Sequence, residues 1–167
     1  MSFVSSRAAA IRTNKKCEVY IATVPLKAPR GPPQVLMSTL YSLNLFQFQH
    51  YMVIINNNNN NASQSEVLVC DFQPEDPEDI FTAVSALSGG KVPGVVLTRK
   101  LKKLPTRKCW FVGHCSDDDY GVEEGLREFN EDWDTDLRIG HHDCRNYVNE
   151  LVEFLTGEKQ VLARGIS

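Results

Sequence analysis

The sequence predicts an α+β domain in which an antiparallel sheet packs against helices, one of which carries a cysteine at its N-terminus. Short segments rich in β-branched residues, each bounded by turn-forming residues, predict the strands. Two amphipathic segments near the C-terminus predict helices, because their apolar residues recur at steps of three and four. A strand, a helix, a group of strands and then a helix pair follow one another, and this order is typical of the α+β class.

Five segments predict strands. They are residues 17–24 (CEVYIATV), 48–55 (FQHYMVII), 66–72 (EVLVCDF), 95–99 (VVLTR) and 109–113 (CWFVG). Between the second and the third lies a run of asparagines at 56–61, which has no apolar side chain to bury and predicts a solvated loop. We therefore expect the second and third strands to pair as a hairpin.

Three helices are expected before the C-terminal one, at residues 34–45, 77–88 and 121–132. In the third of them Val122, Leu126 and Phe129 share one side, as the helical repeat requires. Pro and Gly residues before and between these segments break the chain into separate elements.

The C-terminal helix is predicted between Asp143, a favourable N-cap, and Gly157, a favourable residue for ending a helix. Its apolar face consists of Cys144, Tyr147, Val148, Leu151, Val152 and Leu155. A helix N-terminus carries partial positive charge and free N–H groups, and both favour a thiolate over a thiol. Cys144 is therefore either a nucleophile mounted on this helix or a small apolar residue buried beneath it.

Composition excludes several classes of protein. The chain has 167 residues, 42% of them hydrophobic, and a net charge of −3, so we expect one domain with a core and no nucleic-acid partner. No apolar run approaches the roughly 20 residues that a transmembrane helix needs. Five cysteines, an odd number, without a secretory signal predict reduced thiols and an intracellular, cytoplasmic location.

The folded domain is predicted over residues 17–160, followed by a C-terminal tail at 161–167. Residues 1–16 contain Arg, Ser and Ala and no acid, so they are interpreted as a flexible tail or a short targeting segment, with organelle import as the open alternative. The basic segment 99–108 and the acidic segment 117–119 are interpreted as solvated loops.

A thiol nucleophile needs a base within hydrogen-bond reach and benefits from a third polar group that orients the base. His50 is the strongest candidate base because it opens an apolar strand, where an unpaired His is costly. Asp71 lies on the next predicted strand, so the hairpin can bring it beside His50. A helix packed on this sheet would then present Cys144 to His50. His141 and His142 are weaker candidates for binding substrate or tuning the thiol.

A zinc site is an alternative use of some of these residues. The available ligands are Cys109, His114, Cys115, His141, His142 and Cys144. No pair among them has the C-x2-C or H-x3–5-H spacing of structural zinc sites, and Cys144 would have to turn away from the apolar face of its helix. The sequence therefore predicts no metal, and cysteine-dependent chemistry needs no cofactor.

The cysteine helix also resembles a known family. DCRNYVNEL (143–151) resembles the N-C-E-H-F-V-N-E-L motif of the lecithin:retinol acyltransferase-like proteins, with matches at Cys144, Val148, Asn149, Glu150 and Leu151. QHYMVII (49–55) resembles the strand H-W-A-I-Y of that family, which places His50 at its catalytic His. SEVLVCDFQP (65–74) resembles the strand that carries the family's second His, and Asp71 stands at that position.

The resemblance implies a circularly permuted papain-like fold, which these proteins share with the PPPDE thiol peptidases. It implies a hydrolase or acyltransferase in which Cys144 attacks an ester, thioester or (iso)peptide bond, His50 moves the proton and Asp71 orients the imidazole. The expected partner is then an acyl or peptide-conjugate substrate. The alternative is a catalytically silent papain-like domain that serves as a binding or assembly module for a protein partner in a larger complex.

Overall fold

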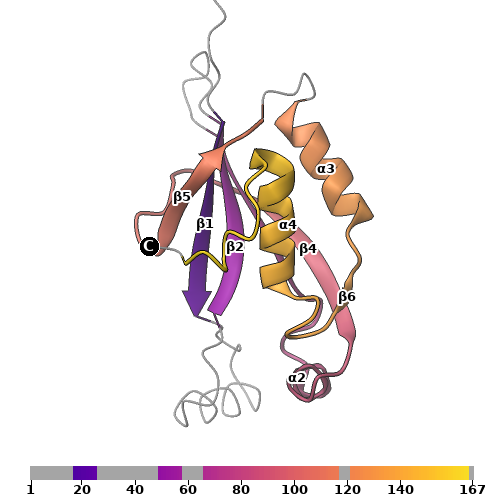
Figure 1. Cartoon of the computed structure of the whole chain (residues 1–167). Coiled ribbons are helices and arrows are strands. Elements are labelled where there is room, and N and C mark those ends of the chain that lie inside the picture. The colour runs from indigo at the N-terminus through magenta and orange to yellow at the C-terminus, as the bar shows by residue number, and fades with distance from the viewer. Residues whose placement is uncertain (1–16, 26–48, 58–65, 117–120, 166–167) are drawn as a thin grey trace, which may run out of the picture.

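The computed structural model describes residues 17–25, 49–57, 66–116 and 121–165 of the chain. Six strands form one antiparallel sheet in the order β5-β1-β2-β3-β4-β6 (Figure 1). The strands are β1 (Cys17–Pro25), β2 (Gln49–Asn57), β3 (Glu66–Pro74), β4 (Val92–Leu101), β5 (Cys109–His114) and β6 (Asp136–Leu137). The helices in the described part are α2 (Ile80–Leu87), α3 (Val122–Asp132) and α4 (Cys144–Thr156). The predicted α+β class with an antiparallel sheet is confirmed.

The helices α3 and α4 lie over one face of the sheet, and the main core lies between α4 and the strands (Figure 1). Side chains alternate along β3, so Leu68, Cys70 and Phe72 enter this core. Tyr147 and Leu151 of α4 belong to the same core, and neither has any exposed surface. The apolar face predicted for the cysteine helix is thus the face that holds the helix on the sheet.

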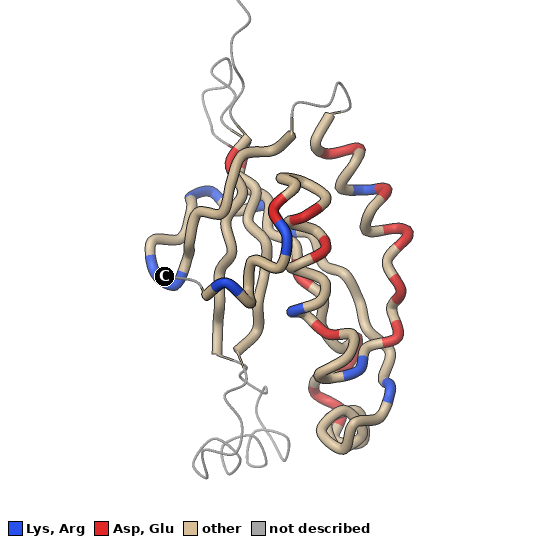
Figure 2. The backbone as a smooth tube through the Cα atoms, viewed as in Figure 1, with Lys and Arg blue, Asp and Glu red and all other residues tan. Residues whose placement is uncertain are grey.

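A second cluster lies on the opposite face of the sheet. Ile54, Val67 and Val69 are at most 2% exposed there, and Leu104 of the β4–β5 connection packs against them. The basic residues of this connection are exposed, as expected for a solvated segment, but Leu104 ties it to the sheet. Figure 2 shows these basic residues apart from the acidic residues along α3.

The ends of α4 follow the expected sequence signals. Asp143 is the N-cap, and it exchanges hydrogen bonds with Asn146 and the first turn in a capping box. Gly157 ends the helix with φ of 78°, a left-handed conformation that costs glycine little. The first residue of α4 is therefore Cys144, as predicted.

Two strands are longer than the sequence suggested. Asn56 and Asn57, expected in the solvated loop, extend β2 and pair with Glu18 and Cys17 of β1. Backbone pairing on both sides of β2 outweighs the turn preference of asparagine. β4 likewise begins at Val92 and includes Pro93, which pairs only with the two-residue edge strand β6. The short β6 itself was not predicted.

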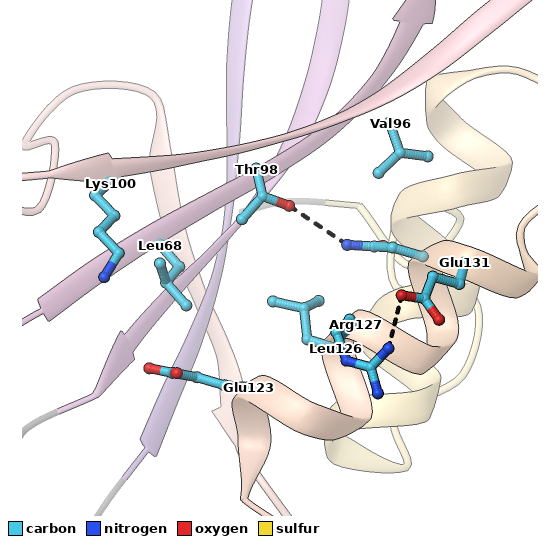
Figure 3. Close-up of a pocket in the computed structure, with 9 residues that line it drawn as sticks. Leu68, Val96, Thr98, Lys100, Glu123, Leu126, Arg127 and Glu131 are labelled. Carbon is cyan, nitrogen blue, oxygen red and sulfur yellow. Dashed lines mark hydrogen bonds and ion pairs between the residues drawn. The ribbon is translucent and has the colours of Figure 1, made fainter.

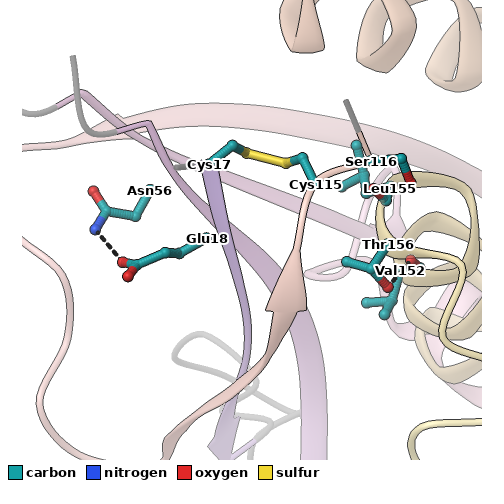
Figure 4. Close-up of a disulfide and its surroundings, with 8 residues drawn as sticks. All are labelled: Cys17, Glu18, Asn56, Cys115, Ser116, Val152, Leu155 and Thr156. Carbon is teal, nitrogen blue, oxygen red and sulfur yellow. Dashed lines mark hydrogen bonds between the residues drawn. A yellow bond between two sulfur atoms is a disulfide. The ribbon is translucent and has the colours of Figure 1, made fainter. Parts of the chain in front are cut away.

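The expectation of five reduced cysteines is wrong for one pair. Cys17 at the start of β1 and Cys115 just after β5 form a disulfide, with their Cα atoms 5.3 Å apart (Figure 4). The neighbouring Ser116 donates its N–H and its hydroxyl to the carbonyl of Leu155 near the end of α4. These contacts join the edge of the sheet to the C-terminal end of α4. The disulfide itself links two residues that are 98 positions apart in the chain.

The chain after α4 turns back along that helix. Val161, placed by the sequence in a C-terminal tail, is 9% exposed and joins the main core. Asn149 Oδ1 accepts a hydrogen bond from the N–H of Leu162, at 3.2 Å. The segments 1–16, 34–45 and 117–119, for which a tail, a helix and a loop were expected, lie outside the described residues.

Candidate active site

The candidate site lies where β2 and β3 stop pairing, beside the N-terminus of α4. The ladder between these strands runs from Asn57 opposite Glu66 to Val53 opposite Cys70, and no described pair continues it. Beyond that point β2 pairs only with β1, where His50 lies opposite Val24. β3 instead continues beside β4. The separation leaves room between the two strands for side chains to meet.

His50 and Asp71 meet in this space. His50 Nε2 lies 2.8 Å from Asp71 Oδ2, and the two side chains are 9% and 1% exposed. The other carboxylate oxygen, Oδ1, accepts a hydrogen bond of 2.6 Å from the guanidinium of Arg99 on β4. A buried carboxylate is costly without hydrogen-bond partners. Each oxygen of Asp71 has one, and the two partners together fix the orientation of the carboxylate.

The charge state of His50 follows from its neighbours. Burial alone would lower the pKa of His50, but hydrogen bonds to Asp71 and to Cys144, together with their charges, raise it to about 9. At neutral pH the imidazole therefore carries a proton. Because Nε2 faces Asp71, Nδ1 is the ring nitrogen that remains for the thiol of Cys144. His50 thus bonds Asp71, and Cys144 lies near enough to His50 to raise the pKa of its imidazole, so the three residues that the sequence singled out lie in one region of the structure.

The N-cap of α4 surrounds this cysteine with further polar groups. Burial favours a raised pKa for Asp143, but hydrogen bonds from Arg145 and from the N–H of Gly140 hold it below its usual value. The carboxylate bonds the Arg145 guanidinium at 2.7 Å and the Arg145 N–H at 2.9 Å. The negative charge next to Cys144 is therefore paired, and the N–H of Cys144 itself is left at the open end of the helix.

The two histidines before Cys144 have other environments. The ring of His142 stacks on Trp133 with centroids 4.6 Å apart, and its Nε2 lies 2.7 Å from the carbonyl oxygen of Asp134. Its backbone forms a bridge with Arg138. Packing and these bonds fix the ring of His142, and its predicted role in binding substrate or tuning the thiol stays a prediction. His141 is exposed on the turn before the helix, without a contact to the three residues above.

Two residues near the site carried no recognisable sequence signal. The sequence places Arg99 both at the end of the predicted strand 95–99 and in the basic segment 99–108, and in the structure it lies on β4 diagonally across from Asp71. Tyr147 was assigned to the apolar face of α4, but its hydroxyl also donates to Asn130 Oδ1 at 2.7 Å. Both contacts depend on the strand register and on the position of α3, and neither can be found from residue spacing.

The other free cysteines lack such surroundings. Burial raises the pKa of the Cys70 thiol to about 11, although a hydrogen bond to Thr98 opposes the shift. Burial also raises the pKa of the Cys109 thiol, which is partly exposed like Cys144. For the zinc alternative, no group of three His, Cys, Asp or Glu residues within the described ranges is arranged so that it could hold a metal ion.

A cavity of about 420 Å³ lies between α3 and the strands β3 and β4 (Figure 3). Leu68, Val96 and Leu126 form its apolar part. Lys100 at its border pairs with Glu66, and Arg127 pairs with Glu131 at 2.7 Å. The cavity contains no nucleophile and is separate from the candidate site.

Comparisons with known proteins place the chain in no family: no family model, no curated protein and no solved structure matches it. Within the described residues, no helix is long and apolar enough to cross a membrane.

Proposed function

We propose that this protein is a cysteine-dependent hydrolase or acyltransferase with a circularly permuted papain-like fold. The observation that carries the proposal is the buried contact of His50 with Asp71, 2.8 Å long, next to a cysteine on the first turn of a helix. The order along the chain, His, then Asp, then Cys, agrees with the permuted fold. A six-stranded antiparallel sheet packed against the cysteine helix supports it further.

In the proposed mechanism the Cys144 thiolate attacks the carbonyl carbon of an ester, thioester or (iso)peptide bond. A carbon–sulfur bond forms while the carbonyl π electrons move to oxygen, and the N–H of Cys144 at the helix N-terminus donates to that oxygen. The protonated His50 gives its proton to the leaving group as the bond to it breaks. A water molecule or a second acceptor then releases the acyl group, and its proton returns to His50.

Each neighbour has a defined task in this mechanism. Asp71 holds the imidazole so that Nδ1 faces the sulfur and stabilises its positive charge. Arg99 fixes the second oxygen of that carboxylate and acts only through it. The protonated imidazole supplies the acid at neutral pH. Once His50 loses its proton, above about pH 9, the leaving group has no acid and turnover should fall.

Iodoacetamide labelling with peptide mapping tests the nucleophile. We expect Cys144 to be alkylated at pH 7 and expect Cys109, the matched partly exposed thiol, to react appreciably only at higher pH. His50→Ala should remove this selectivity. Equal labelling of Cys109 and Cys144 at every pH would refute the proposal and favour a silent binding module.

Hydrolysis of p-nitrophenyl acetate tests the reaction. The wild-type protein should release p-nitrophenol. Cys144→Ala should reduce the rate to that of a control that carries both Cys144→Ala and Cys109→Ser. Activity that survives Cys144→Ala would show that another group is responsible.

A further inference from the structure

A second cavity, of about 380 Å³, lies at the end of β2 that carries His50. Its lining includes Gln49 and Tyr51, the residues on either side of His50 on β2. Gln49 and Tyr51 are two residues apart on the strand, so they share a face, and Tyr51 packs against the main core; the cavity therefore lies on the side of the sheet that α4 covers. Asp143 chiefly raises the pKa of the Arg145 guanidinium and Tyr51 contributes, so Tyr51 lies near the residue that directly follows Cys144.

The other walls come from distant parts of the chain. Thr23 of β1, Trp110 of β5 and Leu162 after α4 complete the lining together with Lys108. The bond from the N–H of Leu162 to Asn149 holds this segment against the first half of α4. Asn149 is five residues after Cys144, about 7.5 Å along the helix. One wall of the cavity is thus held by the first half of the helix that carries the candidate nucleophile.

The lining has an apolar part and a cationic part. Tyr51, Trp110 and Leu162 offer two aromatic rings and an aliphatic side chain. Lys108 brings an ammonium group, and no carboxylate of the described residues lies within ion-pair distance of it. The volume corresponds to roughly a dozen water molecules, at about 30 Å³ each, so it has room for a short chain rather than a whole protein segment.

The backbone holds Lys108 at this place. Its φ is 50°, in the left-handed region that non-glycine residues rarely adopt because it strains their backbone. The carbonyl of Lys108 accepts a hydrogen bond from the N–H of Thr23 at 3.0 Å, which fixes this conformation against β1. The side chain of Lys108 therefore starts from a defined point on the border of the cavity.

We infer that this cavity binds the acyl part of the substrate and prefers a short acyl chain that ends in a carboxylate. The chain would lie against Tyr51, Trp110 and Leu162, with its terminal carboxylate at Lys108 and its reacting carbonyl at Cys144. The inference rests on the proposed function, because it assigns the substrate class of that same site.

Three alkylating probes test it: iodoacetamide, N-hexyl iodoacetamide and 6-(iodoacetamido)hexanoate. All three transfer their CH₂ carbon to the sulfur with loss of iodide, and they differ only in the tail. We expect the hexyl tail to raise the alkylation rate of Cys144 about tenfold over iodoacetamide by burial of its methylene groups. The carboxylate should add a further two- to fivefold, the gain of a solvent-exposed ion pair.

The variants separate the two parts of the cavity. Lys108→Glu should abolish or reverse the preference for the carboxylate probe over the hexyl probe. Lys102→Glu, in the same connection but outside the cavity, is the charge-matched control and should keep the preference. Trp110→Ala should reduce the gain for both tailed probes.

The outcomes distinguish the two proposals. The cavity does not bind the acyl group if the tails give no gain in rate, or if Lys108→Glu leaves the preference for the carboxylate probe intact. The proposed function still stands in both cases, provided that iodoacetamide labels Cys144 in a His50-dependent way. If Cys144 shows no His50-dependent reactivity with any probe, the proposed function is wrong and the assignment of the cavity falls with it.

Discussion

The pair of His50 and Asp71 should make the stability of the folded protein depend on pH. The pKa of His50 is raised to about 9 in the folded state, whereas an exposed histidine in the unfolded chain has a pKa near 6.5. Between these two values the folded protein holds a proton that the unfolded chain has lost. The stabilisation is therefore fully present below about pH 6.5 and disappears as the pH rises through about 9.

The magnitude follows from the same two values. At 1.36 kcal/mol for each pH unit, the free energy of unfolding should fall by about 3 kcal/mol between pH 6 and pH 9.5. His50 is mostly buried, so solvent screens this contribution little. His50→Gln provides the control, because its amide still donates a hydrogen bond to Asp71 but does not titrate in this range.

Urea titrations at a series of pH values measure the effect. The difference in unfolding free energy between the wild-type protein and His50→Gln should change by about 3 kcal/mol across the range, in the direction of a more stable wild type at low pH. Parallel curves for the two proteins would refute the reasoning, because they would mean that His50 has the same pKa in both states. The disulfide must be kept oxidised in both proteins, so that the two series share one reference state.

Three further perturbations test other parts of the structure. Replacing both Cys17 and Cys115 by Ser removes a link between residues 98 positions apart. The loop-entropy model predicts a loss of about 4–5 kcal/mol in the free energy of unfolding, measured by urea titration. An unchanged urea midpoint would argue against the disulfide. Asp143→Asn keeps a good N-cap residue and removes a negative charge beside Cys144. Because Arg145 already offsets that charge, the alkylation rate of Cys144 at pH 7 should rise less than tenfold. A fall in that rate would contradict this account. Gly94→Ala would bring its Cβ to 2.6 Å from the ring of Phe72 and should cost about 1–3 kcal/mol, whereas Gly121→Ala, which meets nothing within 4 Å, should be nearly neutral in the same thermal unfolding assay.

The elements closest to local sequence signals were predicted well. The start and end of α4 follow from Asp143 and Gly157, because a cap acts through its own backbone and the adjacent turn. β1 and β3 follow from their β-branched residues. The strand ends at Asn56 and at Val92 were wrong by several residues, since pairing with a neighbouring strand outweighed the local turn preference.

The sequence by itself determined which residues could carry cysteine chemistry and which helix would present the thiol. A periodic apolar face and an N-cap are local properties, and His50 and Asp71 stood out because polar residues in apolar strands need partners. The sequence predicted that the hairpin can bring these two residues together, and the tertiary structure decided that their side chains bond directly. The 2.8 Å contact depends on where the ladder between β2 and β3 ends, and that register is set by packing across the whole sheet.

The same holds for Arg99 behind Asp71, for the disulfide that joins β1 to the end of β5, and for the cavity beside the helix. Each brings together residues far apart in the chain. Side-chain spacing along a sequence records which face of a strand or helix a residue occupies, but it carries no distance between separate elements. Only the assembled sheet and the position of α4 supply those distances.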